Sequence, residues 1–478
     1  MEKPNRQPES IEIAADIATT SRPRRLDLRL RTLNGTLWRL TWPAVVENLL
    51  FTMVLISDTL ITGWLRDERM LAATALAGLL MFFMNAPFIA FGAAANSIVS
   101  RCWGEYDFRT ARRCAGIAIG LSLGLAILMY FVAYPFTDAV VRLLGAADDV
   151  APISGRYLRI LLLSGFCGYP MMVANAIIRG TGNTHTPMLI TGLMNGVNVL
   201  ASIVLAFGWL GLPAMGVYGV AWGTVIARSV GFACSGGYFV HRRGVGVRLG
   251  DIVGFERRML ARMWRLAWPI LTERLGNSFV YLTFMRLVAG LGTTVLAAHQ
   301  ITLQVESLAF MPAWAMGIAT TTLVGQAVGA RLEHIAESAV RRMMLMSGVL
   351  MGVLGLIFIV FGPLIVRLFG ATEEVIAQAG VAIRISAAEL LFMSWTFIIM
   401  GALRGAGDTR SPLFVSIAST LVFRLGGTML LAHVWGLGLP GVWIATAADW
   451  AMRSLGLGLF FARGAWKHLH ELEKLRFG

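Results

Sequence analysis

The sequence repeats a set of short motifs at a separation of about 225 residues. Val141–Ala146 (VRLLGA) returns as Val366–Ala371 (VRLFGA), and the turn Arg179–Pro187 (RGTGNTHTP) returns as Arg404–Pro412 (RGAGDTRSP). The motifs WRLTWP, ending at Pro43, and WRLAWP, ending at Pro269, mark the starts of the two copies. In a chain this apolar, an internal duplication is typical of a two-lobed membrane transporter with its site between the lobes.

The composition indicates a membrane protein. Hydrophobic residues make up 56% of the 478 positions and charged residues only 14%, against about 25% charged in soluble domains. Each apolar run is long enough to span a hydrocarbon core, which takes about 20 helical residues. The runs lie at 40–64, 71–99, 113–136, 154–178, 186–209, 214–240, 264–290, 295–325, 339–362, 377–402, 411–434 and 439–463. We therefore predict an all-α integral membrane protein with twelve transmembrane helices.

The basic residues predict the orientation. The chain has 41 Lys and Arg against 27 Asp and Glu, and the excess gathers in alternate loops, above all in the Arg-rich central loop. This distribution follows the positive-inside rule. We therefore predict a multi-pass protein of the cell (inner) membrane with both termini in the cytoplasm. The same distribution argues against nucleic-acid binding, although a protein partner for the central loop stays open.

Two copies of six spans have the same orientation, so a pseudo-twofold axis along the membrane normal should relate them. The predicted units are a cytoplasmic tail (1–36), an N-lobe (37–240), a cytoplasmic linker (241–262), a C-lobe (263–463) and a second cytoplasmic tail (464–478). The Arg-Gly-x-Gly turns link spans four to five and ten to eleven, either as tight turns or as a gate hinge.

The energy source must be an ion gradient. The three lysines are Lys3, Lys467 and Lys474, so no nucleotide-binding P-loop is present, and no metal-binding or catalytic motif occurs. We expect no enzymatic activity, no cofactor and no bound metal. Carboxylates inside the membrane become the residues of interest, because burying one costs about 2.5–3.5 kcal/mol.

Three of these carboxylates lie in the first span of a lobe. Glu47 and Glu273 occupy equivalent positions, each four residues after a Trp-Pro motif. They either face the substrate cavity or form buried pairs with an arginine or a helix end. Asp58 has no acidic twin, because its counterpart is Phe284. A carboxylate kept in one lobe only is what we expect of an ion-coupling site.

The remaining buried carboxylates lie in the C-lobe. We interpret Glu389 as a local ion pair with Arg384, and Asp449 as one with Arg453, from their spacing on a helix. The eighth span carries His299, Gln300, Gln304 and Glu306, which either line the substrate cavity or make hydrogen bonds between helices.

The chain resembles the multidrug and toxic compound extrusion (MATE) family over residues 37–463. The motifs that carry the resemblance are Ser57-Asp58-Thr59 after Pro43, the Arg179-Gly-x-Gly-Asn-Thr turn, and the run from His299-Gln-Ile to Gln326. The resemblance implies an antiporter of the inner membrane that exports organic cations and other amphipathic drugs in exchange for H⁺ or Na⁺. It also implies alternation between outward-open and inward-open states, and we expect a monomer in the lipid bilayer.

By position, the resemblance makes Asp58, Asn198 and Thr224 a cation-coupling site. Many family members carry an Asp where this chain has Ser202. Some place acidic residues in spans seven and ten, where this chain has Glu273 and Glu389, which do not clearly share the family's register. A lipid-linked saccharide flippase of the same superfamily is the alternative function. The cationic residues that such a flippase needs are Arg228, Arg274, Arg286 and Arg424. A membrane-embedded prenyl transferase is excluded by the absence of paired Asp-rich motifs.

Overall fold

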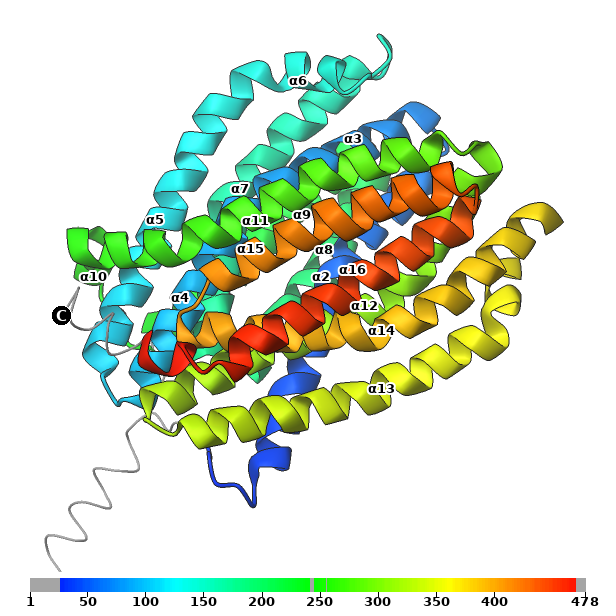
Figure 1. Ribbon diagram of the computed structural model, residues 1–478. Coiled ribbons are helices and arrows are strands. Elements are labelled where there is room, and N and C mark those ends of the chain that lie inside the picture. The colour runs from blue at the N-terminus through cyan, green and yellow to red at the C-terminus, as the bar shows by residue number, and fades with distance from the viewer. Residues whose placement is uncertain (1–25, 241–244, 255, 470–478) are drawn as a thin grey trace, which may run out of the picture.

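The computed structural model describes residues 26–240, 245–254 and 256–469, and no strand occurs in this part of the chain. The first repeat consists of α2 (Leu33–Trp64), α3 (Glu68–Met84), α4 (Ala86–Gly104), α5 (Phe108–Ala133), α6 (Thr137–Leu143), α7 (Ala151–Gly180), α8 (His185–Phe207) and α9 (Val217–Val240). The second consists of α11 (Arg257–Ala289), α12 (Thr293–Gly329), α13 (Glu333–Arg367), α14 (Glu373–Ala406), α15 (Arg410–Ser419) with its extensions η3 (Thr420–Gly426) and η4 (Met429–Val434), and α16 (Gly438–Ala462). Long helices of the two repeats lie alongside one another (Figure 1).

The twelve predicted spans are confirmed as two sets of six helical segments. Among the described residues, ten segments are long and apolar enough to cross a membrane, and α11 and α16 are not among these ten. The second span is divided at Asn85 into α3 and α4, whereas its counterpart α12 continues through Pro312.

Helix α2 begins at Leu33, inside the segment predicted as a tail, and α11 begins at Arg257, inside the predicted linker.

A short helix lies in the predicted linker. Helix α10 (Leu249–Val253) packs on α5, where Arg112 Nε lies 3.1 Å from a carboxylate oxygen of Asp251. Glycine is required at position 116 of α5, because a Cβ there would collide with the backbone of Asp251. The linker segment 241–244 and residue 255 lie outside the described residues, and the lobe boundaries stay predictions.

The second repeat contains one extra residue in its fifth span. Pro187 and Pro412 are 225 residues apart, but Trp209 and Trp435 are 226 apart. The structure accommodates this residue by π-helical winding in η3 and η4, where α8 is a regular α-helix. A π-helical turn is the usual way for a helix to absorb a single insertion, and such turns are frequent at functional sites. The insertion rotates the side chains that follow it.

The two repeats touch closely at one end of the bundle, where α4 crosses α12. A Cβ at Gly104 would collide with the carbonyl of Gln326, and a Cβ at Gly329 would collide with the carbonyl of Arg101. Gln326 also donates from Nε2 to Gly180 O of the first repeat, at 3.0 Å. Glycine is needed at these two positions because the backbones approach more closely than any side chain allows.

Candidate functional site

A buried polar cluster in the first repeat is built around Asp58 of α2. Its carboxylate accepts hydrogen bonds from Asn198 Nδ2 of α8 at 3.3 Å and from Thr224 Oγ1 of α9 at 3.0 Å. Asn198 Nδ2 also lies 3.1 Å from Thr224 Oγ1, and all three side chains are buried. The structure thus brings together the three residues of the predicted coupling site, from three different helices.

No cation touches the Asp58 carboxylate in the described part of the chain. Arg228 attracts the carboxylate electrostatically without touching it. The Nη1 of Arg228 instead donates a hydrogen bond to Ser164 Oγ at 2.8 Å. Asn198 Oδ1 is buried and has no hydrogen-bond partner among the described residues. The carboxylate can take up a proton. Together with the free amide oxygen, it also offers the oxygen ligands that a hard cation prefers.

The corresponding cluster of the second repeat has different chemistry. Phe284 replaces Asp58, Arg424 replaces Asn198 at a separation of 226, and Asp449 replaces Thr224 at a separation of 225. Arg424 Nε lies 2.9 Å from Asp449 Oδ2, and its guanidinium lies 5.9 Å from the centre of the Phe284 ring. The three residues therefore meet as their counterparts do, but here two of them are oppositely charged.

A second arginine completes this cluster. Arg453 of α16 binds both carboxylate oxygens of Asp449, from Nε at 2.8 Å and from Nη2 at 2.9 Å. It also donates to the hydroxyls of Ser416 and Thr420. The prediction that Asp449 pairs with Arg453 is confirmed. Two guanidinium groups thus share one carboxylate that is completely buried.

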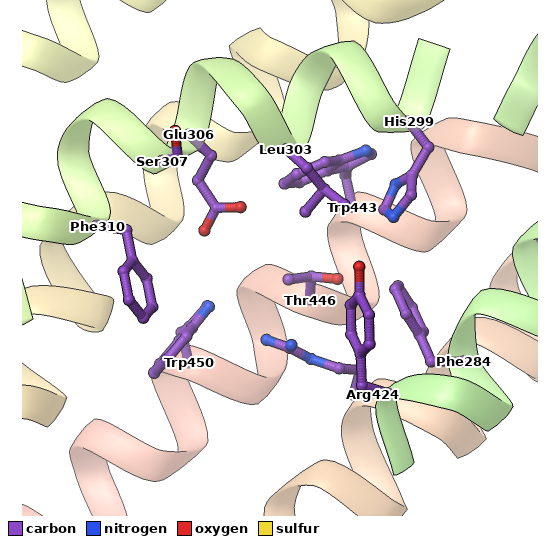
Figure 2. A pocket seen from close by; sticks show the side chains of 11 residues that line it. Phe284, His299, Leu303, Glu306, Ser307, Phe310, Arg424, Trp443, Thr446 and Trp450 are labelled. Atoms are coloured by element: carbon purple, nitrogen blue, oxygen red, sulfur yellow. The ribbon is translucent and has the colours of Figure 1, made fainter. Parts of the chain in front are cut away.

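A cavity of about 230 Å³ opens beside this cluster, inside the second repeat. Figure 2 shows Glu306 of α12 pointing into it from one wall and Arg424 of η3 from the opposite wall. Its lining consists of Tyr281, Phe284, His299, Leu303, Glu306, Ser307, Phe310, Arg424, Trp443, Thr446 and Trp450. Aromatic rings thus form most of the surface between one acidic and one basic group.

The comparisons with known proteins agree with this architecture. The MatE family model matches residues 43–204 and 269–430, one match in each repeat. The chain belongs to the MATE family. It is 28% identical over 90% of its length to the "Probable multidrug resistance protein NorM" of Thermotoga maritima, covering 92% of that protein. It is 30% identical over 89% of its length to the protein of the same name from Deinococcus radiodurans, covering 95% of it.

A solved structure named "Crystal structure of MATE in the bent conformation" shares the fold. Its TM-score with this chain is 0.84 at 22% sequence identity, with 92% of this chain and 97% of that chain covered. The matches confirm the predicted MATE-like fold of two six-helix repeats.

The prediction that Glu389 pairs with Arg384 is wrong. In this MATE chain Arg384 is exposed and its Nε donates to Ile359 O, whereas Glu389 is completely buried. The Glu389 carboxyl instead lies beside that of Glu306, and neither of its oxygens has a well-formed hydrogen bond among the described residues. The spacing argument failed because it considered one helix alone, while Glu306 approaches from the neighbouring helix α12.

The polar residues of α12 divide between two faces. His299 and Glu306 line the cavity, whereas Gln300 and Gln304 are exposed and do not line it. Gln300 and Gln304 share a helical stripe with Met311, whose sulfur contacts Thr52 of the first repeat. Neither glutamine forms a hydrogen bond with the first repeat among the described residues, so their role in a substrate cavity between the lobes stays a prediction.

Glu47 and Glu273 form equivalent ion pairs with the first arginines of the two Arg-Gly-x-Gly turns. Arg179 Nη1 lies 2.5 Å from Glu47 Oε1, and Arg404 Nη2 lies 2.6 Å from Glu273 Oε2. Neither glutamate lines the described cavity. Of the two possibilities left open by the sequence, the buried pair is the one observed, and a contact with substrate stays a prediction.

The position of Arg424 in the site was not predicted from the sequence. Arg424 was considered only as one of the cationic residues that a flippase would need. When the two repeats are aligned at a constant separation of 225 residues, Arg424 corresponds to Val199 rather than to Asn198. The one-residue change in separation between the Pro and Trp landmarks was the available signal. With that correction, the sequence alone aligns Arg424 with Asn198.

Proposed function

We propose that this MATE protein exports amphipathic drugs, chiefly organic cations, in exchange for H⁺ or Na⁺, with Asp58, Asn198 and Thr224 as the coupling site. The observation that carries the proposal is the Asp58 carboxylate, which is buried, hydrogen-bonded only by neutral donors and free of direct contact with any described cation. A buried carboxylate without a counter-ion is costly, so a bound proton or metal cation stabilises it.

The mechanism follows from competition for this negative charge. When the coupling cation occupies Asp58, the carboxylate no longer attracts a cationic drug, and the drug leaves toward the outside. Because Asp58, Asn198 and Thr224 lie on α2, α8 and α9, a change in their hydrogen bonds alters how three helices pack. Such a change can bias the equilibrium between the outward-open and inward-open states.

The names of the relatives support a multidrug substrate range. Both NorM proteins are called probable multidrug resistance proteins, and they match this chain over nearly its whole length. We place the protein as a monomer in the inner membrane with both termini in the cytoplasm. A lipid-linked saccharide flippase is less well supported, because Arg424 is the only arginine that lines the described cavity.

The test is a transport assay in proteoliposomes with a fluorescent cationic dye. A pH gradient and a Na⁺ gradient are imposed separately, and dye accumulation is followed against its concentration gradient. We expect one of the two gradients to drive accumulation, and its dissipation by an ionophore to stop it. Dye movement that ignores both gradients would exclude the antiport proposal.

A further inference from the structure

The second-repeat cavity contains buried donors that have no partner. Trp443 Nε1, Trp450 Nε1 and Arg424 Nη2 are all buried without a hydrogen bond in the described part of the chain, and their side chains line the cavity. Trp443 and Trp450 are 0% and 7% exposed. Unsatisfied buried donors are rare and costly, so they indicate a ligand or water that accepts hydrogen bonds here.

The charge of the basic wall points to an anionic group. Arg424 and Arg453 together carry two positive charges, and Asp449 carries one negative charge. Arg453 holds both oxygens of Asp449 and also donates to two hydroxyl groups, while Arg424 contacts one oxygen and borders the cavity. The uncompensated positive charge therefore lies on Arg424. A carboxylate matches the planar fork of donors that a guanidinium presents.

The opposite wall presents the reverse charge. Glu306 is 9% exposed and points into the cavity across from Arg424 (Figure 2). Its neighbour Glu389 is completely buried behind it, so the two adjacent carboxyls together make this wall acidic. A ligand between these walls meets one positive and one negative group.

The space between the charged walls suits an aromatic ring. Phe284, Phe310, Trp443 and Trp450 line it together with Tyr281. The cavity, at about 230 Å³, exceeds the roughly 150 Å³ in which an engineered apolar cavity binds benzene. Aromatic walls also stabilise an ammonium group by cation–π contact.

We propose that this cavity binds a small aromatic zwitterion, with its carboxylate on Arg424 and its ammonium group on Glu306. An aromatic cation leaves the Arg424 Nη2 donor unfilled and is repelled by the positive charge of Arg424. An aromatic anion is repelled by Glu306 in the same way, so either single charge binds more weakly. That the protein also transports this ligand rests on the proposed export function. Binding of the ligand to the cavity does not depend on that function or on a gradient.

Three compounds with one aromatic core test the proposal. Phenylalanine is the zwitterion, phenethylamine is the cation and 3-phenylpropionate is the anion. Their binding to the purified full chain in nanodiscs is measured by isothermal titration calorimetry at neutral pH. We expect phenylalanine to bind at least tenfold more tightly than either of the others. Equal affinities, a preference for the cation, or no binding by any of the three would overturn the proposal.

Two variants assign the charges. Glu306→Gln should raise 3-phenylpropionate to the affinity of phenylalanine, and Arg424→Asn, which introduces the residue found at Asn198, should do the same for phenethylamine. Arg384→Gln removes an exposed charge of the same repeat and should leave the order unchanged. If all variants bind the three compounds in the wild-type order of affinity, the assignment of the two charged walls is wrong even when binding occurs.

The dye assay separates this inference from the proposed function. Gradient-driven dye export without phenylalanine binding would overturn the zwitterion site alone. Phenylalanine binding without gradient-driven export would overturn the antiport proposal alone.

Discussion

The two repeats use the same three positions in opposite ways. In the first repeat a lone carboxylate, Asp58, is surrounded by neutral donors. In the second repeat the equivalent helix carries Phe284, and a carboxylate on α16 is held by Arg424 and Arg453. The cation of the second repeat is thus part of the protein and cannot leave. The comparison teaches that, at these three positions, the first repeat keeps a carboxylate with no described protein cation beside it, as the proposed coupling site requires.

Two kinds of scaffold contact are the same in both repeats. Each repeat ties its first helix to its Arg-Gly-x-Gly turn by one ion pair, Glu47 to Arg179 and Glu273 to Arg404. Each also contributes a glycine to the crossing of α4 and α12. Substitutions in the scaffold should therefore have similar effects in both repeats, whereas substitutions at the sites should not.

The largest expected effect on stability comes from Asp449→Asn. It leaves two buried guanidinium groups without a counter-ion, and breaking a buried pair in this way costs about 3–5 kcal/mol. We expect a strong drop in the Tm of the detergent-purified protein. Asp58→Asn, which removes the carboxylate of the other repeat, should change the Tm little because no guanidinium touches Asp58. Equal losses in the two variants would contradict the contrast between the repeats.

Glu47→Gln and Glu273→Gln should have matching, smaller effects. Each substitution leaves one arginine, Arg179 or Arg404, without its carboxylate partner. The side chain of that arginine is 13% exposed, so water offsets part of the lost interaction energy. We expect about 2–3 kcal/mol in each case. The measurement is the Tm of each variant and of the double variant. A large effect in one repeat only would show that the two pairs do not serve the same structural role.

Gly329→Ala should separate the closely packed crossing of α4 and α12. Its Cβ would collide with the carbonyl of Arg101, and overpacking of this kind costs about 1–3 kcal/mol. Gly352→Ala in α13 is the matched control, because a Cβ there meets nothing within 4 Å. Disulfide cross-linking between cysteines placed on α4 and α12 should weaken in Gly329→Ala and persist in the control. Unchanged cross-linking in both would show that the crossing tolerates a side chain.

The smallest effects belong to the neutral partners of Asp58. Asn198→Ala and Thr224→Ala each remove one hydrogen bond to the Asp58 carboxylate, worth about 1 kcal/mol, or about fivefold in an equilibrium constant. We expect each to change the ion concentration for half-maximal dye export by about that factor. Ser419→Ala removes a 2.7 Å hydrogen bond to Asp449 in the other repeat and should leave this concentration unchanged.

Much of this organisation was predictable from the sequence, for reasons that the residues make plain. Repeated motifs and apolar runs follow from the duplication and from the lipid solvent, and Asp58 stands out because its twin is Phe284. What escaped prediction depends on contacts between helices. Glu389 lies beside Glu306 rather than Arg384, and the faces of α12 could not be assigned from one helix. Arg424 escaped because a single inserted residue in a π-helical segment shifts the alignment.

Asp58→Asn in gradient-driven transport is the measurement that tests the central claim most directly. Proteoliposomes containing the wild-type protein or the variant are loaded with dye, and two rates are compared: accumulation against the dye gradient and exchange of dye at equal concentrations. The account predicts that the variant loses accumulation and keeps exchange, because the exchangeable cation site is gone while the lobes still alternate. Accumulation at the wild-type level in Asp58→Asn would contradict it.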